Sequence, residues 1–127
     1  MQQSKLYEFA VIRIVPRVER EEFINAGIIV FCKKEKYLSC KYELNEEKLL
    51  CLYADADIEF IRQNLQAFAN IALGKKSDSE IAALDTPERF RWLTATRSTV
   101  IQASKVHPGL CFNEDETLEK LFQQYVK

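Results

Sequence analysis

Two long apolar segments lie close to the start of the chain, at Leu6–Val15 and Phe23–Cys32. Both carry β-branched and aromatic residues at successive positions, which is typical of central strands that are covered on both faces. Pro16 ends the first segment, since proline has no N–H group to donate to a neighbouring strand. Tyr37–Leu44 alternates apolar and polar residues, which indicates a half-exposed strand. The pattern predicts an antiparallel meander of three strands, in which Gly27 marks a bulge or a close backbone approach.

After this meander, apolar residues recur at intervals of three and four, which indicates helices. The predicted helices cover Glu46–Tyr53 behind Asn45, a longer stretch from Asp57 to Gly74, a short stretch after Ser77, a stretch that starts at Thr86-Pro87-Glu88, and a last one from Asn113. Between the last two, the segment Ser98–Ala103 returns to the pattern of a strand.

Together these elements predict the α+β class. We expect an antiparallel meander of three N-terminal strands plus a later strand, packed against helices on one face. A length of 127 residues leaves room for a single domain over residues 1–127. The composition, 47% hydrophobic and 29% charged, is that of an ordinary globular protein.

Charge and cysteine usage narrow the possible functions. The 18 basic and 19 acidic side chains give a net charge of -1, which argues against a generic nucleic-acid coat or a polybasic membrane anchor. The chain has no secretory signal in its first ten residues and no apolar run near the roughly 20 residues of a membrane span, so we expect a cytoplasmic protein. The four cysteines form no C-x-x-C pair, so we expect reduced thiols without a metal or cofactor. A Cys32–Cys40 bridge across a hairpin is the alternative.

The main candidate for a binding site is an arginine-rich segment with Arg89, Arg91, Trp92 and Arg97. Guanidinium groups bind phosphate or carboxylate through paired hydrogen bonds, and an indole ring offers a stacking face. The segment therefore predicts an anion site for phosphate, a nucleotide or an acidic peptide. The alternative is that the arginines pair with acidic residues such as Glu22 and hold their helix to the meander. An exposed tryptophan favours the site, and a buried one favours the structural role.

The loop between the first two predicted strands adds four polar candidates, which are Arg17, Arg20, Glu22 and Asn25. Loops on a rigid sheet often carry binding residues. Whether this loop contributes to a site or only supplies salt-bridge partners, we expect it to lie beside the arginine-rich segment.

Three further residues complete the set of candidates. Arg13 is a charge inside an apolar strand, so it either reaches solvent along its stem or points into a pocket shared with Arg97. His107, the only imidazole, is interpreted as a turn residue before Pro108-Gly109. Ser98 lies nearby in the sequence but does not belong to a recognisable nucleophile motif.

Three stretches, YEFAVIRIVPRVEREEFINAGIIVFC, FRWLTATRSTVIQ and HPGLC, resemble the bacterial domain-of-unknown-function family 3037, in the same order. The resemblance runs over nearly the whole chain and is least distinctive in the middle. It implies no particular chemistry, because the family has no assigned activity. It does imply a partner, a kinase-like protein that resembles the HipA toxin kinase and is encoded beside family members.

The sequence favours a non-enzymatic interaction or regulatory module over an enzyme. It has no glycine-rich phosphate loop and no calcium-loop pattern. The alternative is a nucleic-acid or nucleotide-binding domain that uses the arginine cluster. A catalytic site that combines Glu22 with His107 is the least favoured hypothesis.

Overall fold

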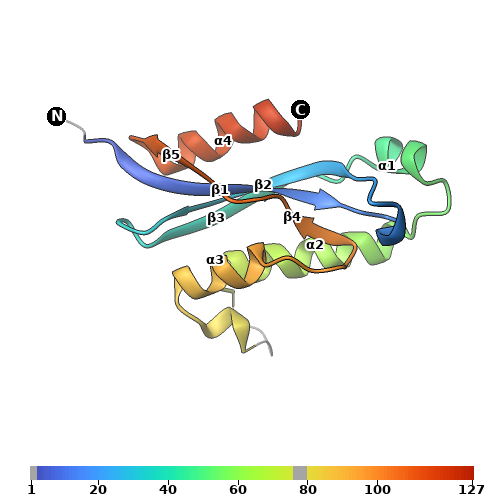
Figure 1. Ribbon diagram of the computed structural model, residues 1–127, viewed down its shortest axis with the longest axis horizontal. Helices are drawn as coiled ribbons and strands as arrows, with labels where there is room; N and C mark the ends of the chain where they lie inside the picture. The colour runs from blue at the N-terminus through green and yellow to red at the C-terminus, as the bar shows by residue number, and fades with distance from the viewer. Residues whose placement is uncertain (1–2, 76–79) are drawn as a thin grey trace.

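The computed structural model describes residues 3–75 and 80–127. Five strands in this part of the chain form one antiparallel sheet (Figure 1). They are β1 (Lys5–Ile14), β2 (Ile24–Cys32), β3 (Tyr37–Tyr42), β4 (Ile101–Ala103) and β5 (His107–Cys111). The strand order is β3-β2-β1-β4, and β5 also pairs with β1.

Strand β1 is the axis of the sheet because it borders three other strands. Strand β2 lies along one side, while β5 pairs with the first half of the other side and β4 with the second half. Ser104 lies between the two short strands and binds Val11 twice. Its N–H donates to the Val11 carbonyl over 2.8 Å, and its hydroxyl accepts from the Val11 N–H over 2.8 Å.

Gly27 lies where β2 passes close to β3. A Cβ atom at this position would lie 2.5 Å from the carbonyl oxygen of Lys41, which is closer than real Cβ contacts. The register of β1 against β2 also shifts between Ile12 and Arg13, opposite Gly27 and Asn25. Both features predicted for this glycine, a bulge and a close backbone approach, are therefore present.

Within the described residues the helices are α1 (Glu46–Leu52), α2 (Ile58–Ala72), α3 (Thr86–Thr94) and α4 (Glu114–Tyr125), with 3-10 turns η1 (Val18–Arg20) and η2 (Ile81–Ala83). Asn45, Asp57 and Asn113 cap α1, α2 and α4 through their side chains, as predicted. The side chain of Asp85 accepts from the Thr86 N–H at the start of α3. No helix in residues 3–75 and 80–127 has the length and apolar character to cross a membrane.

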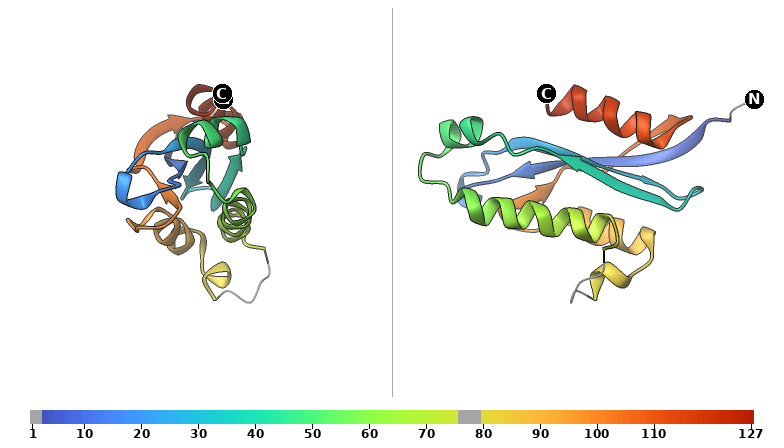
Figure 2. Two further views of the ribbon diagram at one scale, coloured as in Figure 1. Left: turned by 90° about the vertical axis from the view of Figure 1, so that its right-hand side faces the viewer. Right: turned by 180° about the vertical axis from the view of Figure 1, so that it is seen from behind.

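Helices cover both faces of the sheet, which gives three layers (Figure 2). Helices α2 and α3 pack on one face around a cluster that includes Leu65 and Phe90. Helix α4 packs on the other face, chiefly over β2 and β3, around a second cluster that includes Val30 and Leu121. Alternate residues of β1 belong to the two clusters, because successive side chains of a strand point to opposite faces.

The α+β class and the N-terminal meander are confirmed, but two details differ from the prediction. The helices were expected on one face, whereas α4 covers the second. Because β1 and β2 are apolar on both faces, each face needs a cover, and the apolar stripe of α4 supplies one. Strand β5 replaces the turn predicted at Pro108-Gly109, since a strand at the edge of a sheet tolerates proline. Ser77, predicted to open a short helix, lies outside the described residues.

Candidate functional site

Arg89 and Arg91 project from different sides of α3, because residues two positions apart on a helix do not face each other. Arg91 donates two hydrogen bonds, of 3.0 and 2.9 Å, to the Glu8 carboxylate of β1, and these bonds raise the pKa of Arg91 above its ordinary value. Arg89 donates to the Leu84 carbonyl over 2.7 Å and lies against Gly74. The two guanidinium groups therefore bind separate partners and do not converge on one anion.

Trp92, which is exposed, and Arg97, which is half-buried, are the remainder of the predicted arginine surface. The Arg97 guanidinium lies 4.0 Å from the centre of the Trp92 ring and donates to the Trp92 carbonyl. Trp92 is 37% exposed, and no carboxylate in the described part of the chain pairs with Arg97. Beside the pair, α2, α3 and β4 border a hollow of about 170 Å³, whose apolar lining includes Phe68 and Ile71. In this hollow the Arg97 guanidinium lies beside an apolar surface.

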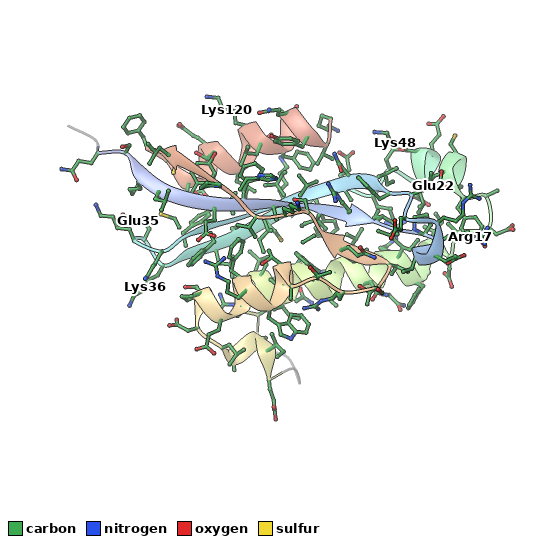
Figure 3. All side chains as sticks on the ribbon, viewed as in Figure 1. Arg17, Glu22, Glu35, Lys36, Lys48 and Lys120 are labelled. Carbon is green, nitrogen blue, oxygen red and sulfur yellow. The ribbon has the colours of Figure 1, made fainter. Side chains whose placement is uncertain are left out.

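The loop with Arg17, Arg20 and Glu22 lies at the end of the molecule that carries α1 (Figure 3). Its charges pair locally, Arg17 with Glu19 at 2.8 Å and Arg20 with Glu22 at 2.7 Å. Arg17 also lies 5.7 Å from the centre of the Tyr53 ring. Among the described residues no ion pair joins this loop to Arg89, Arg91 or Arg97, because Glu19 and Glu22 bind the loop's own arginines.

Arg13 and Asn25 are sheet neighbours at the bulge between β1 and β2. Arg13 lies 4.1 Å from the centre of the exposed Phe23 ring. Asn25 donates to the Tyr125 carbonyl at the end of α4 over 3.1 Å. Neither lines the hollow beside Arg97, so the expected pocket shared by Arg13 and Arg97 does not form among the described residues.

His107 belongs to β5, where its ring packs 5.4 Å from that of Phe9. It pairs with Phe9 of β1, while Glu22 comes before β2, whose first residue pairs with Ile14. At roughly 3.3 Å per residue of strand, the backbone positions of the two residues are separated by about 15 Å or more, which is too far for their side chains to share a reacting atom. Ser98 is exposed in the segment that leads to β4. The hypothesis of a Glu22–His107 catalytic site is therefore wrong.

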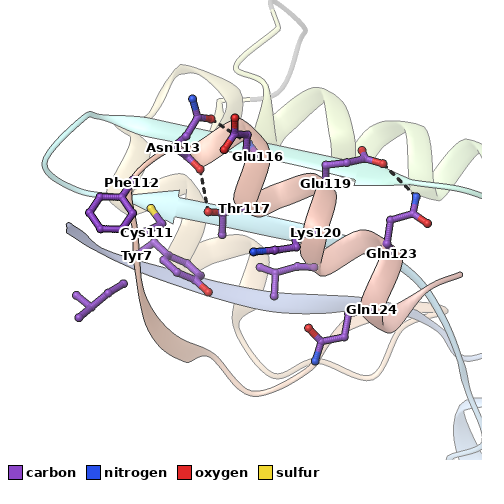
Figure 4. A pocket seen from close by; sticks show the side chains of 12 residues that line it. Tyr7, Cys111, Phe112, Asn113, Glu116, Thr117, Glu119, Lys120, Gln123 and Gln124 are labelled. Carbon is purple, nitrogen blue, oxygen red and sulfur yellow. Dashed lines mark hydrogen bonds between the residues drawn. The ribbon is translucent and has the colours of Figure 1, made fainter. Parts of the chain in front are cut away.

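The groove between β5 and α4 was not predicted (Figure 4). It has a volume of about 730 Å³, with Tyr7 and Cys111 on the side of the sheet and Lys120 on the side of the helix. The ring of Tyr7 lies across Gly109, where a Cβ atom would be 2.5 Å from it. The available signal was the apolar run that ends at Phe112, and Pro108-Gly109 masked it by resembling a turn.

Polar contacts fix the wall that α4 contributes to this groove. Lys5 of β1 pairs with Glu114 at 2.5 Å, and this bond holds the pKa of Glu114 below its ordinary value. The Tyr37 hydroxyl of β3 donates to Asp115 over 2.7 Å, and burial together with this bond raises the pKa of Tyr37. The first turn of α4 is thus tied to two strands.

Residues 9–126 match the family model described as protein of unknown function (DUF3037). No curated protein and no solved structure matches the chain. The family match covers nearly the whole chain, and the family has no described activity.

Proposed function

The chain belongs to the DUF3037 family of proteins of unknown function, and from its geometry we propose a non-enzymatic interaction module that binds a protein partner through Trp92 and Arg97. The partner presents an acidic or phosphorylated side chain to the guanidinium. The kinase-like protein implied by the resemblance to the family is the first candidate partner. We place the complex in the cytoplasm, a setting in which the four free cysteines stay reduced.

The pair of the exposed Trp92 and the half-buried Arg97 is the observation that supports this proposal. Tryptophan and arginine are among the residues most enriched at the energetic centres of protein interfaces. Arg97 binds the Trp92 carbonyl through one nitrogen, which leaves its other N–H donors for a carboxylate or a phosphate. The hollow next to the pair can accept an apolar side chain of the partner. We therefore expect recognition of a charged side chain that is flanked by an apolar one.

Co-purification with the neighbouring kinase-like protein, followed by titration calorimetry, tests the proposal. Trp92→Ala and Arg97→Ala should each weaken binding by about tenfold or more, as expected for residues at the centre of an interface. Phe60→Ala and Arg20→Ala are matched controls, because both residues are exposed and neither lines the hollow. A chain that ignores this protein at micromolar concentration would contradict the assignment of the partner.

A nucleic-acid or nucleotide-binding domain is the second candidate, and the same pair favours it because bases stack on aromatic rings and guanidinium groups. Arg89 and Arg91 already have partners, so we expect few phosphate contacts and weak binding. Titrations with single-stranded DNA and RNA at two salt concentrations separate the candidates. Salt-sensitive binding that weakens in Arg97→Ala and not in Arg20→Ala supports the second candidate, and flat titrations remove it.

A further inference from the structure

Strand β5 has an open outer edge. Among the described residues, β5 pairs only with β1, so the backbone groups on its other side have no strand partner. An open edge is a template on which another strand can add. This edge borders the groove beside α4, and that groove has no lining residue in common with the Trp92–Arg97 hollow.

The outward backbone groups of β5 follow from the pairing pattern. Val11 directs both its N–H and its carbonyl toward Ser104, so the odd-numbered residues of β1 make the hydrogen bonds on this side. Their partners in β5 are the odd-numbered residues from His107 to Cys111. Pro108 and Leu110 therefore point their backbone groups outward. Leu110 offers both a donor and an acceptor, whereas Pro108 offers a carbonyl alone.

Exposed apolar side chains gather at the same edge. Leu110 is 69% exposed and pairs across the sheet with Leu6, which is 61% exposed. Phe112, directly after the strand, is 57% exposed. These are the three most exposed large apolar side chains in the described part of the chain. Apolar side chains grouped in this way mark an interaction surface.

The charges beside the edge have opposite signs. Glu116 and Lys120 line the groove, and neither forms an ion pair with a residue that the structure describes. The α4 residue Thr117 lines the groove together with Cys111, and Lys120 projects over Tyr7, whose ring covers Gly109 (Figure 4). Leu110 lines the same groove as the two charged residues.

We propose that two copies of the chain pair through β5, antiparallel and around a two-fold axis at Leu110. Directly opposite residues of an antiparallel pair can exchange both backbone hydrogen bonds, so Leu110 satisfies its own outward donor and acceptor on the second copy. The same axis places the apolar side chain of Leu110 against its copy. It also turns Glu116 of one copy toward Lys120 of the other, so the surface is complementary to itself in charge.

Pro108 limits this ladder. In the register centred on Leu110, the complete residue Leu110 pairs with its own copy, while Pro108 stands opposite Phe112, just beyond the strand, and offers a carbonyl alone. The paired segment is short, so we expect a weak dimer with a dissociation constant of about micromolar order.

Sedimentation velocity of the full chain over a concentration series tests the proposal. We expect a monomer–dimer equilibrium, and Leu110→Lys should raise the dissociation constant by about tenfold or more, because a lysine on each copy meets its like charge. Phe60→Lys is the matched control, since Phe60 is an exposed apolar residue of α2 that lies outside the groove. Circular dichroism shows whether each variant is folded.

Charge exchange tests the arrangement independently of Leu110. Glu116→Lys and Lys120→Glu should each weaken the dimer, because each places like charges across the axis, and the double variant should restore it. A wild-type chain that stays monomeric up to millimolar concentration overturns the proposal. So does a dimer that Leu110→Lys leaves unchanged, or one that the double exchange fails to restore. A monomer whose β5 instead binds an extended segment of a different protein would also overturn it.

Discussion

Gly27 lies where β2 passes close to β3. A Cβ atom there would lie 2.5 Å from the Lys41 carbonyl oxygen and 2.8 Å from the Cβ of Tyr42. We expect Gly27→Ala to lower the free energy of unfolding by about 1–3 kcal/mol, measured by urea denaturation, because these atoms belong to a fixed strand. Gly109→Ala is the control. Its Cβ would also approach an atom at 2.5 Å, but in the ring of Tyr7, which can rotate away. Equal losses would contradict this explanation.

The four thiols differ in their access to solvent. Burial raises the pKa of Cys40 to about 12 and also raises that of Cys111, while Cys51 is exposed. Because the thiolate is the reactive form, we expect iodoacetamide at about pH 8 to modify Cys51 first and the other three slowly. Peptide mass spectrometry measures the order, and Cys51→Ser should remove the fast reaction. Rapid modification of Cys40 would contradict the packing of β3.

For single residues, the sequence was informative wherever a local rule applies. Asn45 and Asp57 cap their helices as predicted, because a cap bonds to a backbone group three positions away. Arg91 shows where prediction from local sequence rules ends. Its partner Glu8 lies 83 positions away in the sequence, and only the packing of α3 against β1 brings the two together. A charge pattern identifies a basic segment but does not identify its partner.

The same limit applies to whole elements. Helices α2 and α4 and strand β3 have clear periods, and strands β1 and β2 are long apolar runs, so the sequence predicted all five. Strand β5 has no period and contains Pro108-Gly109, so it exists because β1 is long enough to pair with it. The groove beside α4 could not be predicted, because it depends on this unpredicted strand and on the cover of a second face.

The attachment of α4 should depend on pH through Glu114. Lys5 lowers the pKa of Glu114 from its ordinary value of 4.5, so the ionised form is favoured in the folded chain. The stability from this pair is present above pH 4.5 and is lost as the pH falls through the lower pKa of the folded state. We expect the urea midpoint of the native chain to fall more steeply below pH 4.5 than that of Glu114→Gln, in which the charge is absent. Parallel curves would show that the Lys5–Glu114 pair does not stabilise the fold.

At the scale of the whole molecule, the sheet has a layer of helices on each face, and two of the exposed surfaces in residues 3–75 and 80–127 are candidates for binding. One is the Trp92–Arg97 hollow among α2, α3 and β4, and the other is the edge of β5 beside α4. The two have no lining residue in common. The net charge of -1 gives neither surface a general attraction for polyanions, so each depends on its own local contacts.

Because the two surfaces share no residue, we expect binding of the partner and self-association to be independent. Trp92→Ala should leave the sedimentation profile of the free chain unchanged, and Leu110→Lys should leave the affinity for the kinase-like partner unchanged. The double variant should weaken partner binding as much as Trp92→Ala alone and self-association as much as Leu110→Lys alone. Each free-energy change should agree within about 0.5 kcal/mol, as for distant sites without shared contacts. Sedimentation and calorimetry on the same preparations measure both quantities. A Trp92→Ala chain that no longer dimerises would show that the helices beside the hollow transmit a change to β5, through the pairing of β4 and β5 with the same strand, β1.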